Sequence, residues 1–255
     1  MKVDFGKTSD DYRAHRAGFP DDFFERAAGF GIGTGDQDIL DLGTGTGTLA
    51  RTFALRGNRV TATDISEPQI EQARELDRDA GVSVSHQIAP SEETGLPDAA
   101  FDVVTAGQCW HWFDRPKAAA EVMRLLRPSG CLVICHFDWL PIPGSVVEAT
   151  EALIVRHNPD WTMGGGTGIY PHWFKDLAGA GFRNIESFTF DVATTYSHEA
   201  WLGRVRASAG IAASLNDHAV EAFNEEHAAL LRDQFPEDPL ACPHRVFAVM
   251  GRKSG

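Results

Sequence analysis

The segment DILDLGTGTGT, residues 38–48, decides the fold. It starts as a short apolar strand pattern, passes through three glycines that alternate with threonines, and leads into a helical pattern at Thr48. Glycine permits the positive φ angles of a tight turn and lets the backbone approach a bound nucleotide closely. The segment therefore predicts a strand, a glycine turn (residues 43–47) and a helix, with a ligand site where the strand ends.

Two aspartates flank this turn in the predicted fold. Asp41 precedes the first glycine, and Asp64 ends the next predicted strand, where a carboxylate can accept both hydroxyls of a ribose. A dinucleotide motif would have a third glycine at position 48, which is Thr48 here. A negative group at Asp41 suits a ligand that carries an ammonium or sulfonium better than a pyrophosphate. An NAD(P)-linked oxidoreductase is therefore the weaker alternative.

The rest of the chain alternates short apolar runs with helical patterns, which predicts βαβ units around a mostly parallel sheet. Besides 38–42, strands are expected at 59–63, 82–87, 101–106, 131–137, 183–190 and 245–250. Helices are expected at 9–30, 48–56, 66–80, 115–126, 171–180, 198–210 and 217–234, and within 141–156 after a proline-rich turn.

The pattern Asp41-x-Gly43-x-Gly45-x-Gly47, followed by Asp64, resembles motifs I and II of class I S-adenosylmethionine (SAM)-dependent methyltransferases. The order of strands, with a helical insertion before the last one, is similar over residues 5–250. The resemblance implies an α/β fold: a Rossmann-like seven-stranded, mostly parallel sheet with an antiparallel last strand, helices on both faces and a helical cap. One domain is then expected over 1–255, divided into an N-terminal helical cap (1–30), a cofactor-binding core (35–140), cap segments (141–181, 192–240) and the last strands (183–190, 245–250).

The resemblance also implies SAM as the cofactor. The loop with Gly43, Thr44, Gly45 and Gly47, preceded by Asp41, would pass under the methionine part. Asp64 would hold the ribose, Ile65 would pack against adenine, and Gln108 would approach the methionine moiety. The family often has an Asp after the third strand, where this chain has Pro90. Ser91, by backbone or side chain, or Glu92 is the expected substitute, although Glu92 is equally typical of a solvated loop.

The loop after the fourth strand, QCWHWF at residues 108–113, resembles a subgroup that includes the trans-aconitate methyltransferase relatives. This implies that His111 and Trp112 line the substrate pocket, with Trp110 as a further candidate. Alternatively the rings of Trp110, Trp112 and Phe113 pack under the next helix, and the prediction is that one or two of the aromatic rings belong to the core. His111 is the first candidate for a general base.

The N-terminal segment resembles the family's opening helix, and it supplies further candidates. Tyr12 and His15 follow His111 as possible bases. Tyr12 and Arg16 share one helix face. Arg16 is expected to meet a carboxylate of SAM or of an acidic substrate, or to pair with a neighbouring Asp at the surface.

The charge balance limits the partners. The chain has 255 residues, with 36 Asp and Glu against 23 Lys and Arg, which gives a formal net charge of −13. This argues against nucleic acid and anionic lipid as partners. Ten acidic and three basic residues lie between positions 186 and 240, so the expected cap suits a small uncharged or cationic molecule, in conflict with the carboxylate suggested by Arg16.

Other sequence features point to a protein without a metal site, a membrane span or a secretory segment. No histidine pair has metal-ligand spacing, and no apolar run reaches the roughly 20 residues that cross a bilayer. Cys131 and Cys135 fall in an apolar strand pattern and are expected to be buried thiols rather than a metal or redox pair, in a reduced, cytoplasmic setting. The expected activity is in-line methyl transfer from SAM to oxygen or nitrogen of a small organic molecule, with a SAM-binding protein that transfers no methyl as a further alternative. The sequence does not predict the oligomeric state.

Overall fold

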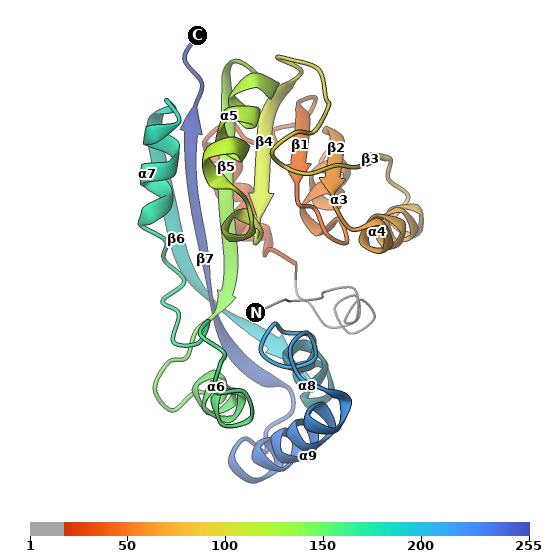
Figure 1. Ribbon diagram of the computed structural model, residues 1–255, viewed down its shortest axis with the longest axis vertical. Helices are drawn as coiled ribbons and strands as arrows, with labels where there is room; N and C mark the ends of the chain where they lie inside the picture. Colours follow the sequence, from red (N-terminus) through yellow and green to blue (C-terminus); the bar gives the residue numbers. More distant parts are fainter. Residues whose placement is uncertain (1–17) are drawn as a thin grey trace. The chain divides into compact units, whose positions relative to one another are not determined.

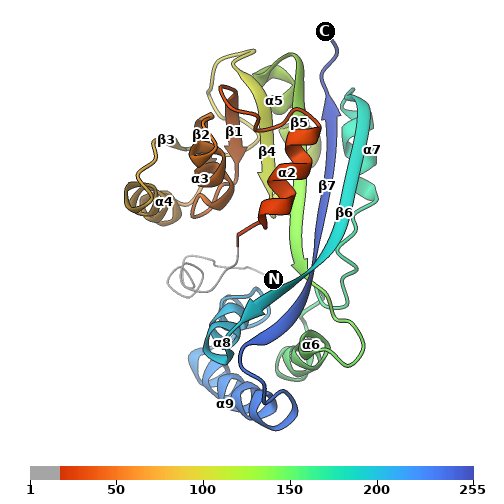
Figure 2. The ribbon, with the colours of Figure 1, turned by 180° about the vertical axis from the view of Figure 1, so that it is seen from behind.

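The computed structural model describes residues 18–255, which form one seven-stranded sheet with helices (Figures 1 and 2). The strand order is β3-β2-β1-β4-β5-β7-β6. The strands are β1 (Asp38–Leu42), β2 (Arg59–Asp64), β3 (Val84–Ile88), β4 (Phe101–Gly107), β5 (Leu126–Trp139), β6 (Arg183–Tyr196) and β7 (Leu240–Arg252). The helices are α2 (Asp21–Gly29), α3 (Thr48–Leu55), α4 (Glu67–Asp79), α5 (Arg115–Leu125), α6 (Val146–His157), α7 (His172–Gly179), α8 (His198–Arg206) and α9 (Asp217–Gln234), with a short 3-10 helix η2 (Trp110–Trp112).

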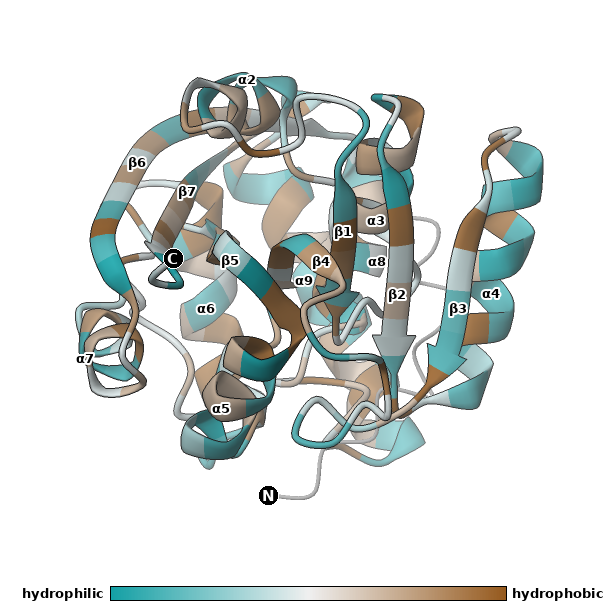
Figure 3. Cartoon of the chain, turned by 90° about the horizontal axis from the view of Figure 1, so that it is seen from above, coloured by the Kyte–Doolittle hydropathy of each residue, from teal (hydrophilic) through white to brown (hydrophobic). Residues whose placement is uncertain are grey.

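Strand direction confirms the predicted mixed sheet. β1 pairs in parallel with β2 on one side and with β4 on the other. β2 also pairs in parallel with β3, and β4 pairs in parallel with β5. Figure 3 shows β3, β2 and β1 side by side, and in Figure 1 the arrowhead of β7 points opposite to that of β5. The carboxyl ends of β1, β2 and β4 therefore meet at one edge of the sheet.

The chain forms two compact units. Unit 1 contains 138–169 and 190–245 with the helices α6, α8 and α9, and unit 2 contains 18–137, 170–189 and 246–255. All the residues that we place in the site below lie in unit 2.

Alternating side chains of the strands give unit 2 two apolar faces. Leu40 and Leu42 are fully buried in a cluster that includes Trp110, Val122 of α5 and Leu177 of α7. Because successive side chains of a strand point to opposite faces, Ile39 and Asp41 face the other side. Figure 1 shows α5 and α7 in front of the sheet, and α2 lies in front in the opposite view of Figure 2. The predicted helices on both faces are confirmed.

Unit 1 has a hydrophobic core of its own. Trp161, Trp201 and Phe223 are buried in a cluster to which α6, α8 and α9 all contribute. Side chains cap each of these helices by accepting a backbone N–H of the first turn: Ser145 from Glu148, Ser197 from Ala200, and Asn216 from Ala219. Each cap satisfies one amide that would otherwise lack an intrahelical partner.

Three strands are at least six residues longer than predicted, and β2 and β4 each extend one residue further than expected. β5 was expected at 131–137 but starts at Leu126, because Leu126 pairs with Phe101 of β4 before an irregularity in the register. β6 was expected to end at 190 and β7 to begin at 245, but they extend to Tyr196 and from Leu240. At the other end of the chain, α2 covers Asp21–Gly29 of the helix predicted over 9–30, and residues 9–17 lie outside the described part.

Candidate functional site

The glycine turn has the left-handed backbone that its sequence predicts. Gly43, Gly45 and Gly47 have φ angles of 61°, 56° and 79°. A Cβ atom at Gly43 would lie 2.9 Å from the Cβ and Sγ of Cys109, which is closer than real Cβ contacts come. Glycine is therefore required here by both the backbone angle and the close packing of the loop after β4.

Asp64 is held against this turn by two backbone amides. Gly45 N–H donates to its Oδ2 and Ser66 N–H donates to its Oδ1, both at 2.9 Å. The next residue, Ile65, is 76% exposed at the end of β2. The structure thus brings a fixed carboxylate and an exposed apolar side chain together beside the turn.

Asp41 is the buried acid of the site. It is 2% exposed, and its carboxylate accepts hydrogen bonds from the hydroxyls of Thr44 at 2.6 Å and Thr105 at 2.7 Å. Burial is the largest effect on this group and raises the pKa of Asp41 to about 6, and the charge of Asp64 raises it further, whereas the two hydroxyl donors oppose the shift. A cation bound beside it would stabilise the ionised form.

Gln108 forms the corner between β4 and the following loop. It has a positive φ of 60°, and its backbone N–H donates to Cys135 O at 2.9 Å. Its side-chain amide nitrogen donates to Phe137 O at 2.8 Å, so the side chain is held along β5. The next residue, Cys109, donates its thiol to Leu42 O at the end of β1. The corner is therefore fixed to both neighbouring strands.

The loop after β3 is tied to the ends of β2 and α5. Ala89 N–H donates to Asp64 O at 3.1 Å. The Ser91 hydroxyl donates to Glu92 Oε2 at 3.0 Å, and Glu92 Oε1 accepts the N–H of Asp114 at 2.8 Å. Glu92 thus has structural partners, and an adenine contact by Ser91 or Glu92 stays a prediction.

The aromatic side chains of residues 110–112 divide between core and surface. Trp110 is fully buried, and its indole N–H donates to Asp176 at 3.1 Å. The prediction that Trp110 lines the substrate pocket is therefore wrong, because the ring has no exposed surface that a ligand could contact. Trp112 is 48% exposed, and the exposed His111 ring lies 4.5 Å from it, centre to centre.

A row of rings continues inward from His111. Its ring centre lies 5.2 Å from that of the buried His136, which lies 4.6 Å from Tyr170. Tyr170 stacks on the buried Trp173 with ring centres 4.0 Å apart and planes inclined by 5°. This packing supports His111 from below and leaves its outer side at the surface.

Three predicted residues, Tyr12, His15 and Arg16, lie outside the described residues, so their roles stay predictions. Sequence reasoning missed Thr105, whose hydroxyl holds Asp41. The available signal was a single hydroxyl side chain in an otherwise apolar run at the end of β4.

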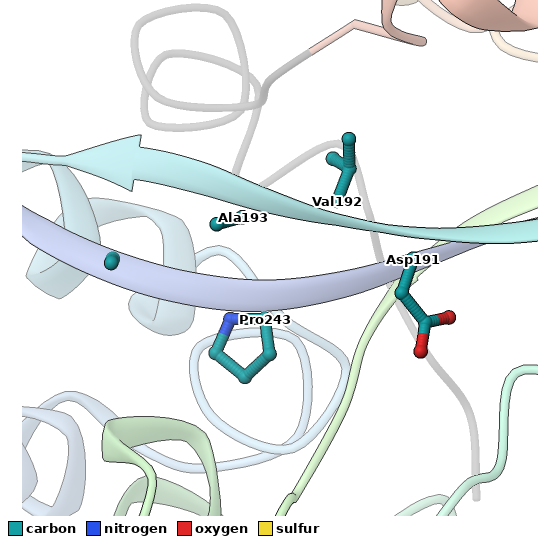
Figure 4. A pocket seen from close by; sticks show the side chains of 5 residues that line it. Asp191, Val192, Ala193 and Pro243 are labelled. Carbon is teal, nitrogen blue, oxygen red and sulfur yellow. The ribbon is translucent and has the colours of Figure 1, made fainter.

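Two further findings concern sites elsewhere. A shallow hollow of about 240 Å³ lies on unit 1, lined by Asp191, Val192, Ala193, Ala241 and Pro243 (Figure 4), and no predicted site residue lines it. In the described part of the chain, no group of three or more His, Cys, Asp or Glu side chains is arranged to hold a metal ion, and no helix there is long and apolar enough to cross a membrane.

Comparison with known proteins agrees with this geometry. Residues 40–134 match the family model described as a methyltransferase domain. A malonyl-[acyl-carrier protein] O-methyltransferase of Serratia marcescens is 34% identical over 130 residues, which are 51% of this chain and 49% of the relative. The chain spans about half the length of the curated relatives it matches.

Solved structures extend the similarity to most of the chain. A candidate type II methyltransferase from Anaeromyxobacter dehalogenans has a TM-score of 0.66 and 25% identity, covering 94% of this chain and 99% of that one. Phosphoethanolamine N-methyltransferase 2 of Haemonchus contortus, solved with SAM, has a TM-score of 0.57 and 17% identity, covering 98% of this chain and 57% of that one, which shows the fold alone. The glycine turn with its two aspartates, the strand order and the matched segment lead to one conclusion: residues 40–134 are similar to a methyltransferase domain, and the chain resembles class I SAM-dependent methyltransferases.

Proposed function

We propose that the protein transfers a methyl group from SAM to oxygen or nitrogen of a small organic molecule. One observation carries this proposal: Asp41 and Asp64 lie near the carboxyl ends of the neighbouring parallel strands β1 and β2. Both accept hydrogen bonds from the same glycine turn, Asp41 from the Thr44 hydroxyl and Asp64 from the Gly45 N–H. SAM carries an ammonium group and a ribose, which are the two chemical groups that these carboxylates fit.

The residues present fit the cofactor part by part. Asp41 is a buried carboxylate whose ionised form gains from a nearby cation, and the ammonium of SAM supplies one. Each carboxylate oxygen of Asp64 accepts one hydrogen bond from a backbone N–H and can accept a further one from a ribose hydroxyl. The exposed Ile65 offers an apolar face to adenine. A pyrophosphate would instead be repelled by Asp41, which disfavours the NAD(P) alternative.

The acceptor is expected near His111 and Trp112. When bound, SAM supplies a methyl group that is already activated by its sulfonium. The protein's task is then to orient the acceptor, exclude water and, for a hydroxyl or amine, accept its proton. His111 is our candidate base, and Gln108 at the fixed corner would help to line the space beside the methionine part. The O-methyltransferase named among the relatives supports an oxygen acceptor.

Several attributes are proposed with this function. The acceptor is a small molecule rather than nucleic acid, since the net charge is −13. Four free, buried cysteines support a reduced cytoplasmic setting. We also propose a subgroup relation to trans-aconitate methyltransferases, which is tested by offering that substrate class.

Calorimetric titration tests the cofactor. SAM and S-adenosylhomocysteine should bind at micromolar concentrations and NADH should not, and the reverse preference would refute the proposal. Labelled SAM offered with a broad metabolite extract should then yield a labelled product. Binding without any product would favour the alternative of a SAM-binding protein that transfers no methyl.

The variant His111→Asn tests the base. For a hydroxyl or amine acceptor, we expect kcat to fall by about 10²- to 10⁴-fold while the Kd of SAM stays unchanged. A kcat within twofold of the unsubstituted protein would exclude His111 as the base. The control Trp112→Phe should change the KM of the acceptor more than kcat.

A further inference from the structure

The Arg51 side chain contacts the backbone of the glycine turn. It lies in the first turn of α3, directly after the turn, and its guanidinium donates to Thr46 O at 2.8 Å and to Ala73 O of α4 at 3.3 Å. A Cβ atom at Gly47 would lie 3.2 Å from the same guanidinium nitrogen. The Arg51 side chain thus packs directly under the turn.

The charge of Arg51 is balanced inside the protein. Its Nε lies 2.9 Å from Asp77 Oδ1, and the other oxygen of Asp77 lies 2.6 Å from His86 Nε2. The side chains of Arg51, Asp77 and His86 are 16%, 5% and 1% exposed. Arg51, Asp77 and His86 thus form a chain of buried polar contacts that joins α3, α4 and β3.

This chain fixes one peptide plane of the glycine turn. The carbonyl of Thr46 and the N–H of Gly47 belong to the same planar unit. The carbonyl accepts from Arg51, and the N–H donates to Thr44 O at 3.0 Å. Thr44 in turn donates its hydroxyl to Asp41. The plane is therefore held from both sides, and a rotation of it would move the residue that contacts Asp41.

Stability alone does not account for such a chain. Desolvating two buried ions costs several kcal/mol each, and well-packed apolar residues of similar volume are often equally stabilising in their place. The polar set does one thing that apolar residues cannot do, which is to donate a hydrogen bond to the Thr46 carbonyl.

We propose that Arg51, Asp77 and His86 are positioning residues that preorganise the glycine turn for its ligand, and that they set the affinity for SAM without touching it. The inference rests on the proposed function, because it takes SAM as the ligand of the turn. Preorganisation lowers the cost of ordering the turn when the ligand binds.

A triple variant separates positioning from folding. In Arg51→Met, Asp77→Leu, His86→Phe, all three polar groups are replaced together, so that no buried charge is left alone. We expect a Tm close to that of the unsubstituted protein, faster amide hydrogen exchange in residues 43–47, and a Kd of SAM about tenfold weaker with kcat unchanged at saturating SAM. An unchanged Kd of SAM would overturn the inference.

The milder variant Arg51→Lys covers the case in which the triple variant does not fold. A lysine keeps the charge beside Asp77 but has no planar fork to reach Thr46, Ala73 and Asp77 at once. We expect the Kd of SAM to weaken about three- to tenfold at unchanged Tm, and an unchanged Kd would again overturn the inference.

Arg59→Met is the matched control, because Arg59 is an exposed arginine at the start of β2 that pairs with Asp38, and its loss should leave the Kd of SAM unchanged. A failure of the unsubstituted protein to bind SAM would refute the proposed function itself. Equal binding by the unsubstituted and triple-variant proteins would refute the positioning role alone.

Discussion

Thr105 and Asp41 are register partners on β4 and β1, and the Thr105 hydroxyl donates to Asp41 Oδ1 at 2.7 Å. The hydroxyl stabilises the carboxylate in its ionised form, the form that would bind an ammonium group. Sheet pairing thereby helps to set the protonation of the candidate cofactor site.

The variant Thr105→Val removes this donor at nearly constant shape. The pKa of Asp41 should rise above its value of about 6, because one of the three hydrogen bonds that lower it is lost. The pH at which SAM affinity reaches half of its maximum should therefore move upward, measured by calorimetry between pH 5 and 8. Thr105→Ser keeps the hydroxyl and should leave the profile in place, and equal profiles for Val and Ser would contradict this role.

Asp41 also makes the stability of the ligand-free protein depend on pH. Its folded pKa of about 6 exceeds the usual 3.8, so its stabilising contribution is present below pH 3.8 and is lost as the pH rises through 6. The loss is about 3 kcal/mol, from two pKa units at about 1.4 kcal/mol each. Asp41→Asn lacks this loss, and its unfolding free energy relative to the unsubstituted protein should increase by up to that amount between pH 4 and pH 7. Urea unfolding at four pH values measures it, and a constant difference would show that Asp41 does not titrate in this range.

A comparison of adenosine and SAM binding should distinguish the roles of the Asp41 and Asp64 carboxylates. Asp64→Ala should weaken SAM and adenosine alike, by about tenfold or more, because both ligands carry the ribose. Asp41→Asn should weaken SAM and leave adenosine unchanged, because adenosine has no ammonium group. Equal losses of adenosine binding in both variants would refute this division of roles.

Two glycines allow the close packing of the turn to be measured. Gly43 and Gly57 both have positive φ, but a Cβ atom meets Cys109 and Phe113 at Gly43 and nothing within 4 Å at Gly57. Gly57→Ala should cost about 1 kcal/mol for the backbone alone. Gly43→Ala should cost about 1–3 kcal/mol more, the range for overpacking. Denaturant unfolding measures the loss of unfolding free energy in each variant. Equal losses would mean that the loop after β4 moves away from the added methyl group at little cost.

The glycine turn and both aspartates could be predicted from the sequence because their signals are local. A strand pattern, glycines that need positive φ and an acid at the next strand end all occur within residues 38–64. The start of β5 could not be predicted, since Pro128, Ser129 and Gly130 look like a turn and only pairing with β4 makes the segment a strand.

The burial of individual side chains and the contacts between distant elements could not be predicted from the sequence either. The sequence near Trp110 and Trp112 contains two similar rings, and nothing local says which one meets Asp176 in the core. Arg51, Asp77 and His86 come from three separate elements, so their contact depends on how α3 and α4 pack on the sheet. Sequence patterns fix the elements, whereas such contacts follow from their packing.

The contrast between Trp110 and Trp112 gives the protein an optical reporter. All six tryptophans lie within residues 18–255, and among them Trp112 is the most exposed, at 48%. Collisional quenchers such as acrylamide will therefore act mainly on Trp112, while the five other indoles emit from more shielded surroundings. Protection of that quenchable fraction of the fluorescence by a bound molecule would locate the molecule beside η2 in unlabelled protein.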